Sequence, residues 1–194
     1  MGNREDLLAG ALTCLLDKGW ARTTVRDIAA AAGVNHAAIG YHFGSRDALL
    51  TEAFMQAFEE WGDEIEAAVA ASLAPDASPH ERYVAFWRQA IESFRAKPKL
   101  WTATLEASLQ LDHTPRIREA LRRGMGEGRS GLAAGLLGVP ETSLDPAALR
   151  VGSVQLALIS GVMLQWLVDP DGAPDPEDIA AGLTVLGRQI DGDT

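Results

Sequence analysis

Apolar residues recur at spacings of three and four along almost the whole chain, which is the period of an α-helix. No run of Val or Ile alternates with polar residues between turn signals, as it would in a half-buried strand. The 194 residues are enough for one sizeable core, or for a small module joined to a larger domain. The sequence therefore predicts an all-α fold of about nine helices and makes a β-sheet improbable.

Three short helices are predicted within residues 1–44, each with its own start and stop signals. A capping side chain opens each helix, and a glycine follows it. In chain order the signals are Asn3 and Gly19, then Thr24 with Asp27 and Gly33, then Asn35 with Phe43 and Gly44. Two short helices joined by a tight turn at Gly33 are typical of a helix-turn-helix, whose second helix enters the major groove of DNA.

Longer helices are predicted after this segment. The first begins at Ser45 and keeps one apolar face over several turns, which suits a helix that links two domains. A proline or a capping residue opens each later helix. The predicted starts are Ser78 with Pro79 and Glu81, Pro98, Thr114 with Pro115, position 146 of a helix over 146–168, and Pro176.

The net charge of -10 and a pI near 4.8 argue against a uniformly basic protein that coats nucleic acid. Residues 1–50 contain five cationic and five acidic side chains, so this part is neutral and the acidic excess lies beyond it. An acidic body with a neutral, locally basic head can orient that head toward DNA.

Residues 24–43 are predicted to present one face to the core and one to solvent. Ile28, Ile39 and Phe43 are expected to point inward, and Val34 is expected to pack in the turn. The residues expected to point outward are Asn35, His36, Ala38, Tyr41 and His42. A tyrosine and two histidines on the exposed face of a short helix have little structural reason to be there, which favours a binding surface.

The residues of this segment resemble the DNA-binding domain of the tetracycline-repressor (TetR) family of bacterial transcription regulators. The resemblance covers about the first 50 residues and rests on Thr24, Asp27, Ile28, Ala29, Ala32, Gly33, Val34, Ile39, Tyr41, His42, Phe43, Ser45, Arg46 and Leu49. It implies a helix-turn-helix domain over 1–46 and a helical ligand-binding and dimerisation domain over 47–194. It further implies a homodimer that binds a palindromic operator and, in most members, represses transcription until a small molecule releases it.

The resemblance also implies roles for single residues. Thr24, Tyr41, His42 and Arg46 are expected to contact phosphates, and Arg26, His36 and Ala38 to face bases, with Asn35 on the same surface. These chemistries fit, because arginine can bridge guanine O6 and N7 and a methyl group can touch the thymine methyl. The alternative is that the two arginines are only solvated surface charges.

Two positions depart from the family pattern. The family often has glycine or proline where this chain has Ala37, and often an aromatic residue where it has Gly40. Gly40 can let the backbone approach DNA closely, but it removes a possible phosphate contact. A ligand-binding helical dimer without operator binding therefore stays an alternative, with Gly40 as its only sequence signal.

The later helices carry aromatic and sulfur side chains that suit the wall of an effector pocket. The pocket residues expected from the family arrangement are Trp61, Phe86, Trp87, Phe94, Trp101, Leu105, Glu106, Met125 and Met163. Plain core packing is at least as good an explanation for each of them. If buried, Glu106 could pair with a cationic ligand; it could equally be exposed or bridge to Arg122 or Arg123.

Residues 146–168 and 176–190 are expected to pair with their two-fold mates as a four-helix bundle. Residues 151–168 carry no charge over a length near the lower limit for spanning a bilayer. Polar residues such as Gln155 and Gln165 favour instead a helix surrounded by protein on most sides. With no secretory signal at the N-terminus, we expect a soluble, cytoplasmic protein without a membrane partner.

No motif in the sequence supports catalysis, a metal or a cofactor. The glycines at 126, 128 and 131 spell GxGxxG, but no strand precedes them, so they are expected to break a helix or to allow close packing. Asp112 and His113 are adjacent without a nucleophile that can be placed beside them, and the four histidines lack metal-binding spacing. One cysteine, Cys14, excludes an internal disulfide. An enzyme is therefore a weak alternative.

Overall fold

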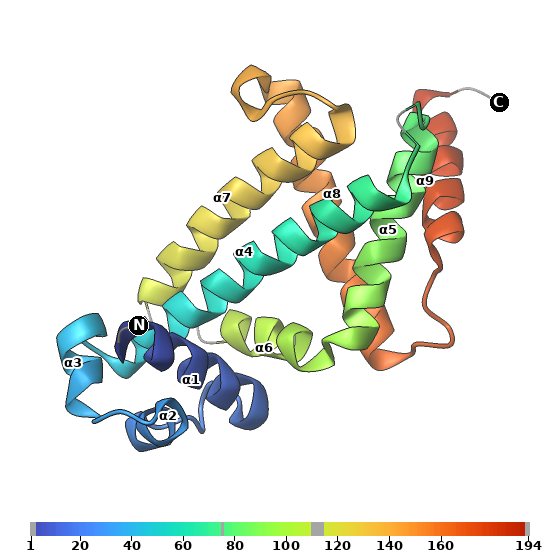
Figure 1. Cartoon of the computed structure of the whole chain (residues 1–194). Coiled ribbons are helices and arrows are strands. Elements are labelled where there is room, and N and C mark those ends of the chain that lie inside the picture. The colour runs from blue at the N-terminus through green and yellow to red at the C-terminus, as the bar shows by residue number, and fades with distance from the viewer. Residues whose placement is uncertain (1–2, 75, 110–114, 193–194) are drawn as a thin grey trace. The chain divides into compact units, whose positions relative to one another are not determined.

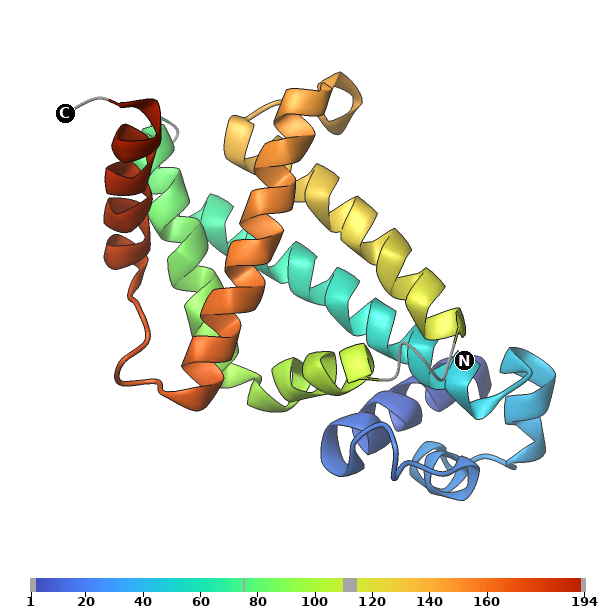
Figure 2. The same cartoon turned by 180° about the vertical axis from the view of Figure 1, so that it is seen from behind.

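The computed structural model describes residues 3–74, 76–109 and 115–192. These residues form nine α-helices, one short 3-10 helix and no strand (Figures 1 and 2). The elements are α1 (Asn3–Lys18), α2 (Val25–Ala32), α3 (Ala37–Phe43), α4 (Arg46–Ser72), α5 (Pro79–Ala96), α6 (Pro98–Leu109), α7 (Pro115–Leu137), η1 (Glu141–Ser143), α8 (Pro146–Val168) and α9 (Pro176–Asp191). The predicted all-α fold is confirmed for the described part of the chain.

The predicted capping residues lie at the helix ends. Thr24 Oγ1 accepts the Asp27 N–H at 3.2 Å, and the Asp27 carboxylate accepts the Thr24 N–H at 2.9 Å, which closes the capping box of α2. Ser78 and Glu81 form the same box at the start of α5. Gly33 ends α2 with a φ of 67°, a left-handed conformation that favours glycine. These ends therefore follow from residues close in sequence.

Helix α7 is continuous through the glycines at 124, 126, 128 and 131. These glycines were expected either to break the helix or to allow close packing, and they do not break it. Gly124 instead allows close packing, because a Cβ there would lie 2.4 Å from Met55 Cε. The short helix η1 after α7 was not expected from the sequence. Asp112, His113 and the predicted helix start at Thr114 lie outside the described residues.

One compact unit comprises residues 1–62 and 99–126. In it α1 packs against α2 and α3. Leu15, Ile28 and Leu49 are at most 1% exposed and form the centre of this core. Trp20, just after α1, is also buried and meets the Phe54 ring edge-on at 5.7 Å between centroids. The helix-turn-helix therefore rests on a tightly packed apolar base.

The second compact unit comprises residues 63–98 and 127–194. Helix α5 packs against both α8 and α9, and buries Trp87 and Ile91. Gly152 on α8 lies against α7, since a Cβ there would meet the backbone oxygen of Arg129 at 1.9 Å. Only glycine fits at this crossing. The predicted division of the chain into 1–46 and 47–194 stays a prediction.

Helix α8 is buried on one face only. Its buried residues include Gln155, Ile159 and Met163. Large apolar side chains on its other side are exposed, namely Val151, Val154, Leu164 and Val168. The expectation that protein surrounds this helix on most sides is therefore wrong within a single chain. Apolar residues occupy both faces, but the chain covers only one of them. Among the described helices α8 alone has the length and composition to cross a membrane, and 33% of that stretch is buried; one such helix is weak evidence for a membrane.

Candidate nucleic-acid interface

The turn between α2 and α3 holds the two helices in a defined geometry. The N–H groups of Gly33 and Val34 donate to carbonyls in the last turn of α2, at 3.3 and 3.1 Å. Ile39 and Phe43 lie one turn apart on α3 and are 2% and 8% exposed. These two side chains anchor α3 to the core, so the opposite face of the helix points to solvent, as predicted.

The exposed face of α3 carries an aromatic side chain that packs little against the protein. Tyr41 is 86% exposed, and its ring meets only the edge of the neighbouring His42 ring, at 4.9 Å between centroids. His36 and His42 are exposed as well. A large aromatic residue held in solvent by a rigid short helix contributes little to stability, and its phenol can both donate and accept hydrogen bonds. This face is therefore built for contact with a partner.

The start of α3 combines capping with exposure. Asn35 Oδ1 accepts the Ala37 N–H at 2.8 Å, but α3 begins at Ala37 and its N-cap is His36, which makes no side-chain capping bond. The prediction of Asn35 as the N-cap is therefore wrong by one residue, and Asn35 is exposed. Ala38 was predicted to point outward, but it is half-buried and packs against the core, so only part of it faces solvent. Gly40 has open space where a Cβ would lie, so no intramolecular contact requires glycine there. A close approach by a partner would account for it.

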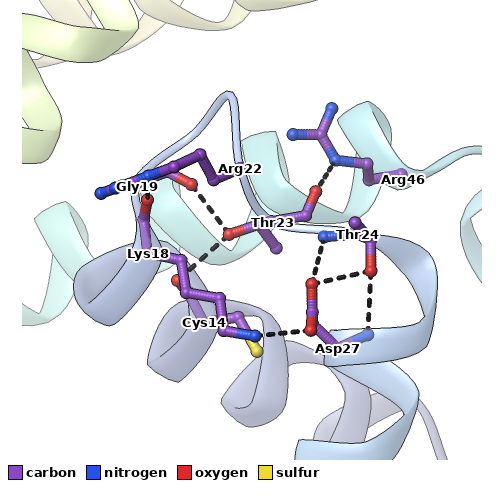
Figure 3. Close-up of polar contacts among 8 residues, drawn as sticks. All are labelled: Cys14, Lys18, Gly19, Arg22, Thr23, Thr24, Asp27 and Arg46. Atoms are coloured by element: carbon purple, nitrogen blue, oxygen red, sulfur yellow. Dashed lines mark hydrogen bonds and ion pairs between the residues drawn. The ribbon is translucent and has the colours of Figure 1, made fainter.

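Thr24 and Asp27 belong to a small polar network at the start of α2 (Figure 3). The Thr24 hydroxyl donates to the Asp27 carboxylate at 2.7 Å, and the Lys18 ammonium pairs with the same carboxylate. The Lys18 ammonium, with the Thr24 hydroxyl and N–H, lowers the pKa of Asp27 to about 2. Asp27 is therefore charged at neutral pH, and the proton of the Thr24 hydroxyl is directed to it rather than outward.

Arg46 at the first position of α4 is bound to the chain around α2 (Figure 3). Its Nε donates to the Thr23 carbonyl at 2.5 Å, its Nη2 donates to the Trp20 carbonyl, and its Nη1 pairs with Asp47 at 2.7 Å. A guanidinium carries five N–H donors, so two remain for a phosphate. The sequence did not reveal this second role of Arg46, because its partners are backbone carbonyls.

The segment between α1 and α2 is also bound by α6. The Trp20 N–H donates to the Glu106 carboxylate at 2.8 Å, and Thr23 Oγ1 donates to the carbonyls of Gly19 and Cys14 at 2.8 and 3.1 Å. The Trp20 peptide is thus bonded on its N–H side by Glu106 and on its carbonyl side by Arg46. Neither Trp20 nor Thr23 was singled out from the sequence, and the bridge from Glu106 to Arg122 or Arg123 is not formed.

Most cations of residues 1–50 are neutralised within the chain. Arg4 pairs with Glu52, and Lys18 and Arg46 pair with aspartates as described above. Arg22 donates its Nε to the Lys18 carbonyl and is exposed. Arg26 is exposed and makes neither a hydrogen bond nor an ion pair with any residue that the structure describes. Arg26 and Arg22 are therefore the cationic side chains of this segment that are most available to a polyanion.

The nine residues predicted to line a pocket divide between the two compact units. Trp61, Trp101, Leu105, Glu106 and Met125 lie in the first unit. There the Trp61 and Trp101 rings meet edge-on at 4.9 Å between centroids, while Leu105 and Met125 are exposed. A small cavity of 210 Å³ lies beside Glu106 and is also lined by Lys18, Ala21, Arg22 and Leu109.

The other four predicted pocket residues, Phe86, Trp87, Phe94 and Met163, lie in the second unit. Trp87, Phe94 and Met163 are buried there, and Phe86 is half-buried. The Phe86 and Trp87 rings meet edge-on at 5.7 Å between centroids. Core packing explains Phe94 and Met163, whereas Trp87 has a polar atom that packing leaves unpaired.

Comparison with known proteins agrees with this geometry. Residues 7–53 match the family model described as bacterial regulatory proteins, tetR family. Residues 7–53 therefore resemble the helix-turn-helix domain of the TetR family. It is 28% identical over 164 residues to the HTH-type transcriptional regulator BetI of Rhizobium meliloti (strain 1021), a match that covers 84% of this chain and 76% of BetI. These matches confirm the predicted resemblance to the TetR family and support a DNA-binding helix-turn-helix transcriptional regulator.

Two solved structures extend the similarity along the whole chain. A candidate transcriptional regulator from Pseudomonas aeruginosa PAO1 superimposes with a TM-score of 0.70 at 25% identity, covering 97% of this chain and 88% of that one. A candidate regulator from Streptomyces coelicolor A3(2), SCO7518, gives a TM-score of 0.66 at 28% identity and covers 96% of each chain. The TetR-family fold therefore includes the helices beyond residue 53.

Proposed function

We propose that this TetR-family regulator is a homodimeric repressor that binds a palindromic operator and is released by a small-molecule effector. The observation that carries the proposal is the exposed face of α3. Ile39 and Phe43 anchor this helix to the core, and Tyr41 on its other side is 86% exposed. In a dimer, two such helices about 34–36 Å apart would occupy successive major grooves. Effector binding would change their separation through α4, and the affinity lost would equal the difference in effector affinity between the two states.

The proposed DNA contacts follow from exposure and from the partners that each side chain already has. Tyr41 and His42 are proposed to bind phosphates, with Arg46 contributing the two N–H groups that its intramolecular bonds leave free. The hydroxyl and the N–H of Thr24 both donate to Asp27, so the predicted phosphate contact of Thr24 is not part of this proposal. Arg26, whose guanidinium has no partner among the described residues, is proposed to read a base edge together with His36 and Ala38. The Asn35 amide N–H₂ group lies on the same surface.

The proposed dimer uses the exposed apolar sides of α8 and α9. On α8 the side chains at 151, 154, 157, 161, 164 and 168 are apolar or glycine and all exposed, and they recur at spacings of three and four. On α9, Val185, Leu186 and Ile190 are between 53% and 75% exposed. Both helices belong to the same compact unit, so two copies can bury these stripes as a four-helix bundle.

The remaining elements of the proposal are coarser. Residues 1–46 are proposed to act as the DNA-binding domain and 47–194 as the ligand-binding and dimerisation domain. The relatives are transcriptional regulators, which supports a cytoplasmic protein without enzymatic activity, metal or cofactor. A ligand-binding dimer without operator affinity is the second candidate, because Gly40 offers DNA no side chain at an exposed position of α3.

Fluorescence anisotropy with DNA from upstream of the protein's own gene, and with DNA selected from a random pool, tests the proposal. Tyr41→Phe removes only the phenol hydroxyl and should weaken all DNA binding about a hundredfold, because the dimer loses one hydrogen bond, worth about tenfold, in each subunit. Arg26→Ala should cost about 1–3 kcal/mol and relax preference at particular base pairs. Arg123→Ala removes the same charge from exposed α7 and serves as the matched control.

The salt dependence of the association constant is an independent test, because it counts the phosphates that the protein neutralises. If Arg22 and Arg46 of both subunits each neutralise one phosphate while Arg26 reads a base, log K should fall with log salt with a slope of about -4. Saturable binding with these variant effects supports the repressor. Failure of the selected pool to yield any sequence bound above random DNA would favour the ligand-binding dimer instead.

A further inference from the structure

The second compact unit contains a phenol, an indole and a side-chain amide that lie together. Tyr83 and Trp87 are one turn apart on α5, with ring centroids 6.4 Å apart. The Tyr83 hydroxyl donates to Gln155 Oε1 on α8 at 3.0 Å. Trp87 and Gln155 are 0% and 3% exposed, and burial raises the pKa of Tyr83. The cluster is therefore polar, uncharged and inside the apolar core.

Two hydrogen-bond donors of this cluster have no partner. Gln155 Nε2 and Trp87 Nε1 are buried and make no hydrogen bond with any residue that the structure describes. The Trp87 N–H lies near the Tyr83 hydroxyl and partly offsets the rise in the pKa of Tyr83, but the two groups do not have hydrogen-bond geometry. If the Gln155 amide were turned over, its oxygen would be the unpaired atom instead. Buried polar groups are nearly always hydrogen-bonded, and each unpaired one costs about 1–3 kcal/mol.

We propose that Tyr83, Trp87 and Gln155 form the polar end of the effector site and bind an uncharged ligand through a carbonyl oxygen. This inference rests on the proposed effector control. A carbonyl oxygen has two lone pairs and can accept from both the Gln155 amide and the Trp87 indole. Such a ligand satisfies the two donors that the protein leaves unpaired.

The charge of the surroundings selects a neutral ligand. The three arginines of α5 are used elsewhere. Arg82 is exposed and donates its Nε to the Ala77 carbonyl at 3.0 Å, Arg88 is exposed and pairs with Glu177, and Arg95 lies over the Trp166 ring at 4.4 Å. A carboxylate at the cluster would be buried without a counter-ion, which is costly. A ketone, ester or amide avoids that cost. Its apolar part would suit Ile91 on α5 and Ile159 on α8, which are buried one helical turn from Trp87 and Gln155 respectively.

Nuclear magnetic resonance of the full-length protein tests this directly. The five tryptophans give five indole N–H signals, and Trp87→Phe identifies that of Trp87. Acetophenone at millimolar concentration should move the Trp87 indole signal downfield, as a new hydrogen bond to a carbonyl does. Ethylbenzene, which has no oxygen, and benzoate, which is an anion, should not. The absence of a Trp87 shift with acetophenone and with cyclohexanone would overturn the proposal.

A matched pair of variants locates the second donor. Gln155→Leu should weaken acetophenone binding about tenfold, because one hydrogen bond is lost. Gln165→Leu makes the same change at an exposed position of α8 and should leave binding unaltered. Equal effects of the two variants would count against a contact between Gln155 and the ligand.

The alternative is that a permanently bound water satisfies these donors as part of the fold. The double variant Tyr83→Phe, Gln155→Leu removes the hydroxyl and the amide together. In the ligand-free protein it should be at least as stable as wild type, because functional polar groups in a core reduce stability. A lower melting temperature would indicate a structural network and overturn the proposal.

Operator binding measured in parallel distinguishes the proposed effector site from the proposed DNA-binding function. A Trp87 shift with unchanged operator affinity supports the site and counts against release by this class of ligand. Loss of the Trp87 shift, with operator binding intact, overturns the site and leaves the DNA-binding function standing.

Discussion

Replacing Arg46 should weaken the fold and DNA binding together, in proportions that the structure allows to be worked out. The side chain is only 25% exposed, and its guanidinium holds the carbonyls of Trp20 and Thr23. These two carbonyls lie in the segment that joins α1 to α2. Arg46→Ala removes both hydrogen bonds and frees the entry of the chain into α2.

The size of the effect follows from two charge-assisted hydrogen bonds. Each is worth roughly 1.5–3 kcal/mol, and partial exposure reduces the sum to about 2–4 kcal/mol. A total stability of about 5–15 kcal/mol means that the variant still folds at 25 °C. Its melting temperature should fall by roughly 5–15 °C. Arg46→Lys should lose about half as much, because one ammonium cannot reproduce the planar fork that reaches both carbonyls.

Thermal unfolding by circular dichroism, followed by operator anisotropy well below the transition, separates the two roles of Arg46. Arg26→Ala is the internal control, because Arg26 has no partner among the described residues and its loss should change stability by less than about 0.5 kcal/mol. The reasoning is refuted if Arg46→Ala melts with the wild type and loses only DNA affinity, with a salt slope reduced by two phosphates per dimer. In that case Arg46 would be a DNA ligand and not a structural clamp.

Three further results are expected. The pKa of Asp27 is lowered from 3.8 to about 2, so its contribution to stability is present above about pH 4 and is lost as the pH falls toward 2. Asp27→Asn should therefore make stability depend less on pH between 4 and 2. Identical acid unfolding curves for the variant and the wild type would contradict this. Glu106→Ala should lower hydrogen-exchange protection of the Trp20 amide while a reporter amide in α9 is unchanged. Val154→Glu should convert the dimer to monomers in analytical ultracentrifugation, whereas Val139→Glu, the same change at an exposed site outside α8 and α9, should not.

Contacts between residues close in sequence were predictable. Thr24 and Asp27 are three residues apart, and the glycine at 33 needs a backbone conformation that other residues avoid, so the boundaries of α2 could be read directly. The buried face of α3 followed from the four-residue spacing of Ile39 and Phe43. The exposed face is what remains, and of the predicted DNA contacts it carries Tyr41 and His42.

Contacts between distant residues were not predictable. The Trp20 peptide binds Arg46 and Glu106, which are 26 and 86 residues away, through backbone atoms that leave no signature in the side-chain pattern. Periodicity also failed for α8, because both of its faces are apolar and only the structure shows which is buried. Gln155, noted as a polar residue in that helix, proved to be one of the buried ones.

The acidic charge of the protein and its DNA-binding function are compatible because binding does not depend on a basic surface. The head contains equal numbers of acids and bases, and internal pairs occupy Arg4, Lys18 and Arg46. Non-specific affinity, which scales with the phosphates neutralised, must therefore be low. Affinity for an operator then has to come from hydrogen bonds and shape at α3, where Tyr41 is held outward and Gly40 leaves room for DNA to approach. Such a surface binds weakly to most DNA and tightly only where all its contacts are met, which suits the proposed release by a small change in the spacing of the two α3 helices.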